Sequence, residues 1–195
     1  MSLAEVYNTL PTIGAANDAF TDREAMFAKL APLLAAYQFQ FGICLVHAHC
    51  TIKEGEAMVA DGNITRPTRD GPQYPERWLA DGTPYEFTRE PTQVPPPELV
   101  RDFQAIVGKD TVLGLFHPSR DHDGKVAPDG KVWIEHTEGR KNIVELIDKD
   151  QMSRHMETAW IPGTDSPVTM VCHWICVKDP QAGHVADHRK AASED

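Results

Sequence analysis

The stretch of sequence that decides the fold is also the most apolar one in the chain, Phe41-Gly42-Ile43-Cys44-Leu45-Val46-His47-Ala48-His49-Cys50. Its length, its Val and Ile content and its aromatic start predict a buried β-strand over residues 39–50. Alternation along such a strand places every second side chain on one face, here Phe41, Ile43, Leu45, His47 and His49. Two histidines two residues apart would then point the same way, and their imidazoles could share one metal ion.

Signals outside this stretch predict a mixed fold in which β-structure dominates. A capping box at residues 21–24 predicts the start of an N-terminal helix that should kink or restart at Pro32. A second helix is predicted over 97–107, with proline at its start and Gly108 after its end. Strands are predicted at 56–65 with a turn at 61–63, and at 84–88, 111–117, 131–137, 142–147 and 168–177. We therefore expect an α+β fold, mainly antiparallel β (a curved sheet, a sandwich or a small cupin-like barrel), with an N-terminal helix and one inserted helix.

The length and composition of the chain are those of one folded domain over residues 1–195. Within it, residues 1–20 are interpreted as an N-terminal arm and residues 179–195 as a polar C-terminal tail. Residues 66–97 are rich in Pro, Gly, Asp and Arg and are interpreted as a long surface excursion.

The charge of the chain argues against several classes of partner. Its net charge is −10 with histidine neutral, and no cluster of Lys or Arg stands out, so nucleic acid and anionic membrane surfaces would repel it. We find neither a signal-peptide pattern nor an apolar run of membrane-spanning length. We expect a cytoplasmic protein whose partner is a small molecule, with no nucleic acid and no membrane partner. Its four cysteines would then be thiols or metal ligands, whereas an oxidising compartment would allow Cys44 or Cys50 to bridge to the C-terminal pair.

Three later histidines stand on predicted strands in the same way as the first pair. Each follows a stripe of apolar residues, and they are His117, His136 and His173. If those stripes face one core, the imidazoles would converge at the mouth of a sandwich or barrel. The alternative is that each of them is a packed core residue, hydrogen-bonded to backbone or to a carboxylate.

The carboxylate that follows the first pair completes a motif. The residues Gly42, His47, His49, Glu54 and Gly62 resemble the first motif of the cupins, in which Gly, His-x-His, Glu and Gly recur along two paired strands. The spacing of each glycine departs by one residue, and the second cupin motif is present only as Pro128-Asp129-Gly130, with His136 several residues late. The resemblance implies a small β-barrel in which two histidines, the glutamate and a later histidine hold an Fe, Mn, Ni, Zn or Cu ion. Glu54 would be the third ligand or a general base.

A second constellation lies near the C-terminus, where the spacings Cys-x3-Cys and His-x3-His are typical of a structural zinc site. Its residues are Cys172, Cys176, His184 and His188. The two histidines would share one face of a helical turn. The two cysteines would need a bulge or turn between them, because two residues that far apart on a straight strand cannot reach one tetrahedral ion.

The sequence therefore predicts a metal-binding protein, and we favour a metal-dependent enzyme acting on a small organic molecule. The cofactor would be a divalent transition metal, Zn, Fe or Cu. Iron would support oxygenase chemistry, and zinc would support Lewis-acid or hydroxide chemistry. Two alternatives stay open: a non-enzymatic domain with a structural zinc at the C-terminal cluster, and a metal-free small-molecule binding protein with core histidines.

Overall fold

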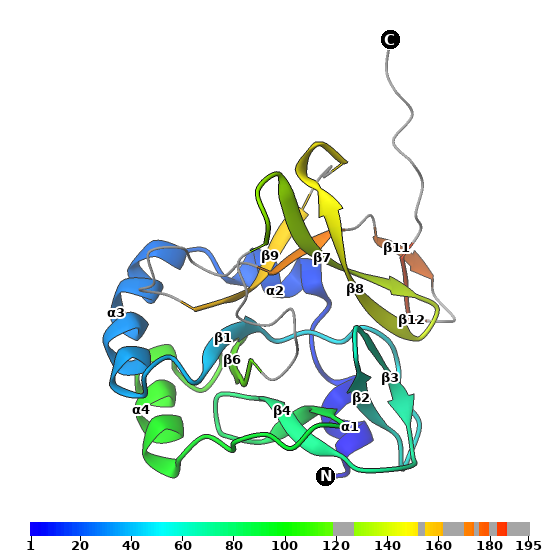
Figure 1. Cartoon of the computed structure of the whole chain (residues 1–195). Coiled ribbons are helices and arrows are strands. Elements are labelled where there is room, and N and C mark those ends of the chain that lie inside the picture. Colours follow the sequence, from blue (N-terminus) through cyan, green and yellow to red (C-terminus); the bar gives the residue numbers. More distant parts are fainter. Residues whose placement is uncertain (119–126, 152–154, 162–169, 174–175, 180–182, 187–195) are drawn as a thin grey trace.

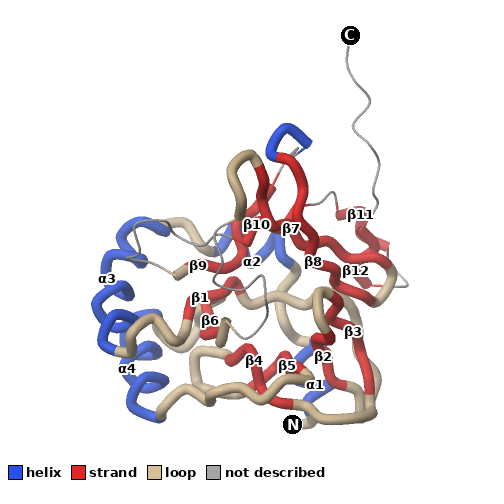
Figure 2. Tube along the Cα trace, viewed as in Figure 1, coloured by secondary structure: helices blue, strands red, loops and turns tan. Residues whose placement is uncertain are grey.

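Strands outnumber helices in the computed structural model, which describes residues 1–118, 127–151, 155–161, 170–173, 176–179 and 183–186 (Figures 1 and 2). The helices are α1 (Leu3–Asn8), α2 (Ile13–Ala19), α3 (Arg23–Ala36) and α4 (Pro97–Val107), with a 3-10 turn at Lys149–Gln151. The strands are β1 (Gly42–Leu45), β2 (Ala57–Asp61), β3 (Ile64–Thr68), β4 (Tyr74–Trp78), β5 (Pro84–Thr88), β6 (Leu113–Phe116), β7 (Lys131–Glu138), β8 (Lys141–Asp148), β9 (His155–Trp160), β10 (Met170–His173), β11 (Cys176–Asp179) and β12 (Gly183–Ala186).

Most of the strands form one strongly curled sheet. Their order is β1-β6-β4-β5-β2-β3-β8-β7-β10-β9, and β9 pairs back with β1 so that the order closes on itself. Neighbours run antiparallel except for β2 with β5 and β7 with β10. Strands β11 and β12 pair with each other in a separate small sheet. The prediction of a mixed, mainly antiparallel fold with a curved sheet is confirmed, whereas its cupin-like form stays a prediction.

Strand β1 is buried on both of its faces. Ile43 and Leu45 belong to the hydrophobic core that α3 and α4 also line. Cys44 packs instead with Phe116 and Ala159. A strand covered on both faces has an unbroken apolar sequence, and this is the pattern that predicted it. The ladder with β6 stops at Leu45 opposite Leu113, so the prediction that the strand continues to residue 50 is wrong.

The first twenty residues, interpreted from the sequence as an N-terminal arm, contain α1 and α2. Helix α1 begins with a capping box in which the Ser2 and Glu5 side chains each bond the other residue's backbone amide. The capping box predicted at residues 21–24 does not form: α3 begins at Arg23, and its N-cap Asp22 makes no side-chain capping bond. Helix α3 also runs through Pro32 without a restart.

The surface excursion predicted for residues 66–97 is wrong as well. It contains the predicted strand β5, but also β4, and both strands are part of the curled sheet. Their side chains Trp78 and Tyr85 are each 1% exposed. Gly71 and Gly82 lie at bends between strands of this segment, and residues 89–96 form an irregular stretch before α4.

The C-terminal part differs from prediction in three elements. The strand expected at 168–177 is two strands, β10 and β11, which lie in different sheets. Strand β9 was not predicted. The segment expected as a polar tail contains β12 and the end of β11.

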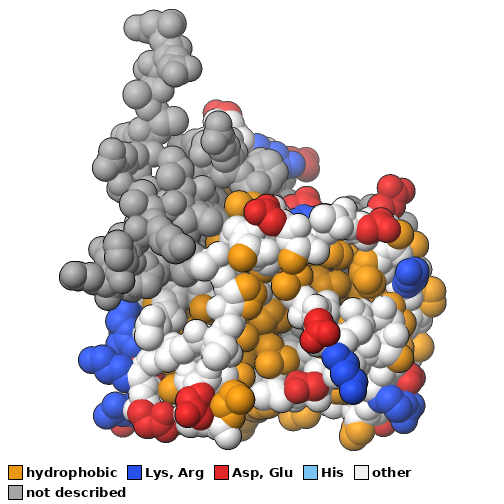
Figure 3. All heavy atoms as spheres, turned by 180° about the vertical axis from the view of Figure 1, so that it is seen from behind, with side chains coloured by type: hydrophobic (Ala, Val, Ile, Leu, Met, Phe, Trp, Pro, Cys, Tyr) orange, Lys and Arg blue, Asp and Glu red, His pale blue; other side chains and the backbone are white. Residues whose placement is uncertain are grey.

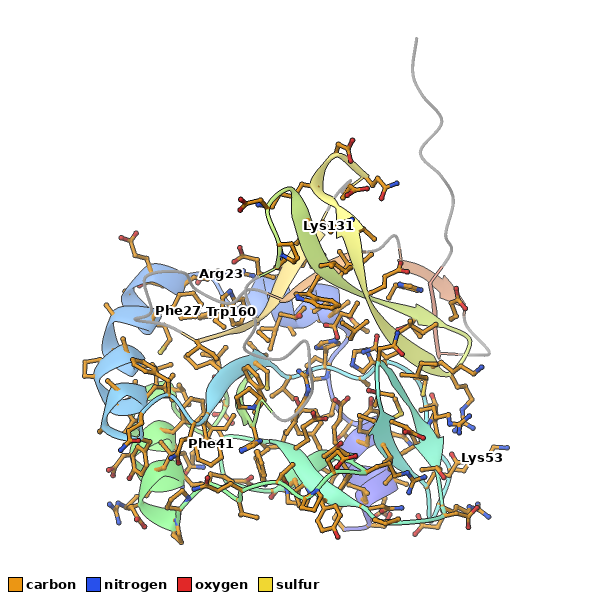
Figure 4. The ribbon with its side chains drawn as sticks, viewed as in Figure 1. Arg23, Phe27, Phe41, Lys53, Lys131 and Trp160 are labelled. Atoms are coloured by element: carbon orange, nitrogen blue, oxygen red, sulfur yellow. The ribbon has the colours of Figure 1, made fainter. Side chains whose placement is uncertain are left out.

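Helix α3 packs against the sheet through contacts with Trp160 at the end of β9. The rings of Phe27 and Trp160 are 5.1 Å apart, and the guanidinium of Arg23 lies 5.3 Å from the Trp160 ring. Figure 4 shows these three side chains meeting between α3 and β9. Figure 1 shows α3 and α4 on the same side of the sheet.

One face of the molecule carries side chains of both charge signs. On the face shown in Figure 3, hydrophobic side chains gather in the middle, and acidic and basic side chains both lie around and among them. Among the described residues, the helices are too short or too polar to cross a membrane.

Gly42 lies at the start of β1, which is closely packed between β6 and β9. A Cβ added there would stand 2.8 Å from the Trp160 carbonyl oxygen and would overlap the Phe116 ring. Because one of these neighbours is backbone, Gly42→Ala should lower the free energy of unfolding by about 2 kcal/mol or more, measured by urea denaturation. Gly62→Ala is the matched control: Gly62 has open space but a φ of +61°, so its replacement should cost only about 1 kcal/mol. Equal losses in the two variants would contradict the close approach of β1 to β9.

Candidate functional site

The two histidines of the first motif lie just after β1 rather than on it. His47 and His49 are 3% and 5% exposed, and their ring centroids are 4.6 Å apart at an interplanar angle of 73°. The predicted pairing of the two imidazoles is therefore present. It does not arise from strand alternation, because the strand has ended at Leu45.

His47 is held in a defined chemical state. Its Nδ1 lies 2.7 Å from the carbonyl oxygen of Leu45, and since a carbonyl only accepts, Nδ1 is the nitrogen that donates. Nε2 then bears a lone pair, and it is buried without a hydrogen-bond partner among the described residues. Burial, reinforced by His49, lowers the pKa of His47 to about 4, so this imidazole is neutral at neutral pH.

His49 contacts a buried carboxylate that the sequence did not single out. Its Nε2 lies 3.4 Å from Oε1 of Glu86, and Nε of Arg77 lies 3.2 Å from Oε2 of the same carboxylate. Glu86 and Arg77 are each 3% exposed. Buried charges of this kind are tolerated only when paired, so these contacts fix the three side chains relative to one another.

A second buried carboxylate, Glu135 on β7, lies within electrostatic reach of both imidazoles. It accepts hydrogen bonds from Asn142 Nδ2 at 3.0 Å and Thr158 Oγ1 at 2.8 Å. Burial alone would raise the pKa of Glu135, but the histidines, Arg77 and the Thr158 hydroxyl outweigh it and hold that pKa well below its usual range. Glu135 is thus anionic at neutral pH.

Tyr7 on α1 joins these groups. It is fully buried, and its hydroxyl donates to Glu86 Oε1 at 3.3 Å and accepts from the backbone amide of His49 at 3.1 Å. We call the whole set the polar cluster: Tyr7, His47, His49, Arg77, Glu86 and Glu135. Its members come from five segments of the chain: α1, the residues after β1, β4, β5 and β7.

Of the other predicted ligands, Glu54 lies apart from the polar cluster. It is exposed on the turn before β2, where its carboxylate accepts from the Ser2 hydroxyl at 2.9 Å. The two imidazoles are buried, so the structure does not bring Glu54 to them.

His117 and His136 are packed in other surroundings. The His117 ring lies 5.8 Å from the Phe41 ring just beyond the end of β6. His136 lies between two carboxylates, with Nε2 3.6 Å from Glu138 and Nδ1 3.5 Å from Glu145. It follows Glu135 directly on β7, and successive strand residues point to opposite faces. The structure therefore does not gather these two histidines with the first pair.

The side chains of the C-terminal constellation lie outside the described residues, as does the whole of His188. The backbone places Cys172 and His173 on β10, Cys176 on β11 and His184 on β12. His184 is paired opposite Lys178, so the helical turn predicted around it is a strand instead.

No family model, curated protein or solved structure matches the chain. The cupin resemblance therefore rests on the motif alone. In the described parts of the chain, no three His, Cys, Asp or Glu side chains form a group that could hold a metal ion as they stand.

Proposed function

We propose that this chain binds a divalent transition metal through His47 and His49 and is a metal-dependent enzyme acting on a small organic molecule. The observation that carries the proposal is His47 Nε2, a buried lone pair without a hydrogen-bond partner among the described residues. The opposite ring nitrogen is held by the Leu45 carbonyl, and this is how metal-ligating histidines are usually fixed. Imidazole ligands suit Zn, Fe and Cu alike.

The charges of the polar cluster support a cation at this place. Two buried carboxylates, Glu86 and Glu135, face one buried guanidinium, that of Arg77. A metal ion beside the histidines would add positive charge close to these two carboxylates, which is a favourable arrangement for a cation.

Glu135 replaces Glu54 as the carboxylate of the proposed site. It is buried and anionic, and among the two cluster carboxylates it has the larger influence on the pKa of His47. Two histidines and one carboxylate leave coordination positions for water or a substrate. Such an ion can activate water when it is zinc and dioxygen when it is iron, and the residues present do not favour one over the other.

A metal-free small-molecule binding protein is the competing function. It is favoured by the contact between His49 Nε2 and Glu86 Oε1, because a proton on His49 would balance the charges without any metal. A metal ion would have to compete with Glu86 for this imidazole.

Metal content separates the two functions. The full chain, purified without added metal and then equilibrated with Zn²⁺ or Fe²⁺ in turn, should retain close to one ion per chain by mass spectrometry. The double variant His47→Ala/His49→Ala should lose at least about tenfold in metal affinity, because both proposed imidazole ligands are gone.

Two variants serve as controls for this measurement. His136→Ala removes a buried histidine outside the polar cluster and should leave the bound metal unchanged. Cys172→Ser/Cys176→Ser would remove metal only if the ion belongs to the C-terminal constellation. A wild-type chain that retains no metal under any of these conditions would refute the proposal and favour the metal-free function.

A further inference from the structure

The backbone around the two histidines has left the sheet and needs other hydrogen-bond partners. Buried amides are almost always paired, so each one identifies the segment that holds it. The amide of Val46 still bonds the Val112 carbonyl at 2.8 Å, beside β6. Beyond it, the amide of Ala48 donates to the Pro11 carbonyl at 3.0 Å.

Helix α1 supplies hydrogen-bond partners for the residues that follow Ala48. The side chain of Asn8 bonds Ile52 in both directions, donating to its carbonyl at 2.8 Å and accepting from its amide at 2.9 Å. Residues 48–52 are thus held by the N-terminal segment in the way that a neighbouring strand would hold them.

Tyr7 contacts His49 itself, the second of the two proposed metal ligands. Its hydroxyl accepts from the His49 amide at 3.1 Å and donates to Glu86 Oε1 at 3.3 Å. Glu86 Oε1 in turn lies 3.4 Å from His49 Nε2. The three residues form a closed ring of contacts that fixes His49 at both its backbone and its side chain.

The Tyr7 hydroxyl keeps its proton in this position. Burial raises the pKa of Tyr7 well above its usual value, and the negative charge of Glu86 adds to that effect. At neutral pH the phenol therefore keeps its proton and serves as donor and acceptor together.

We propose that Tyr7 is a positioning residue of the site: through its hydroxyl, helix α1 sets the place and orientation of the His49 imidazole. The proposal rests on the proposed metal site, since it assigns the second ligand's orientation to α1. The His47 ring is instead fixed by the carbonyl of Leu45, which belongs to its own segment.

The test compares two buried tyrosines that differ in what their hydroxyls contact. Tyr7→Phe removes the bond to the His49 amide and to Glu86, whereas Tyr85→Phe removes a hydroxyl that lies 3.4 Å from Cys44 Sγ. In calorimetric titration with Zn²⁺, Tyr7→Phe should bind about tenfold more weakly than wild type, the size of effect that supporting partners of metal ligands have. Tyr85→Phe should stay within about twofold, because the orientation of His49 is intact. Equal weakening of both variants, or unchanged binding in Tyr7→Phe, would overturn the proposal.

Hydrogen exchange in the metal-free protein separates this proposal from the metal site itself. The His49 amide should exchange about tenfold faster in Tyr7→Phe and at an unchanged rate in Tyr85→Phe. If wild type binds no Zn²⁺ but this difference is observed, the metal site fails while the positioning by Tyr7 stands. If the His49 amide exchanges equally in both variants, Tyr7 does not position His49.

Discussion

Glu86→Gln should destabilise the protein by about 3 to 5 kcal/mol, the largest loss expected for a substitution that hardly changes side-chain volume. Glutamine fits the same space, so the loss does not come from a cavity. It comes from Arg77, whose guanidinium is 3% exposed and would lose the carboxylate 3.2 Å away. Urea denaturation at neutral pH measures the change.

Two further variants test whether the loss of stability in Glu86→Gln comes from the unpaired charge of Arg77. Glu56→Gln removes a carboxylate from a pair with Arg140 in which the guanidinium is 43% exposed, so it should cost about 1 kcal/mol or less. Arg77→Met/Glu86→Met removes both buried charges and should recover part of the stability lost in Glu86→Gln. A loss in Glu86→Gln no larger than that in Glu56→Gln would contradict the buried pair.

The titration of His47 should make a measurable contribution to the pH dependence of the unfolding free energy. An unfolded histidine titrates near 6.5, whereas burial lowers the pKa of folded His47 to about 4. At a pH between these two pKa values, His47 is protonated in the unfolded chain and neutral in the folded chain. Acidification therefore favours unfolding. His47 should therefore reduce the unfolding free energy by about 3 kcal/mol in total as the pH falls from about 6.5 to about 4, with no contribution above that window.

The variant His47→Asn isolates this effect from other titrating groups. The difference in unfolding free energy between wild type and His47→Asn, measured in chelator, should shrink or change sign as the pH falls through this window. A difference that is constant from pH 7.5 to pH 4 would mean that the imidazole is solvated in the folded protein.

Elements with local signals were predictable from the sequence, and elements defined by distant partners were not. Helix α4 begins and ends where predicted, because proline at its start and Gly108 at its end are local features of the chain. Strand β5 likewise has its predicted bounds. The end of β1, in contrast, depends on a distant partner. It is set by β6, some seventy residues away, whose pairing with β1 stops at Leu113. No pattern within residues 39–50 contains that information.

The same reason explains which part of the candidate site was predicted. His47 and His49 are only two residues apart in sequence, so their pairing could be inferred from spacing. Glu86 and Glu135 are buried only because partners on other segments neutralise them, and in the sequence they are indistinguishable from surface glutamates. Strands 84–88 and 131–137 were predicted, so Glu86 and Glu135 could at least be placed on strands from the sequence. Glu54 was chosen by motif spacing and is exposed.

The helix that carries Tyr7 was missed for a further physical reason. Helix α1 has six residues, too few for a hydrophobic repeat to be recognised. Its position is stabilised by contacts with residues 49–52 and with Glu86 rather than by its own propensity.

The closure of the sheet between β1 and β9 has a consequence for how the chain is made. During synthesis β1 leaves the ribosome more than a hundred residues before Trp160, the residue of β9 paired with Ile43. Until then, one edge of the most apolar strand in the protein is open to other chains. Pairings between residues so distant in sequence are slow to form. The nascent polypeptide therefore carries an open apolar edge until β9 emerges, and its need for chaperones should fall once β9 has paired with β1.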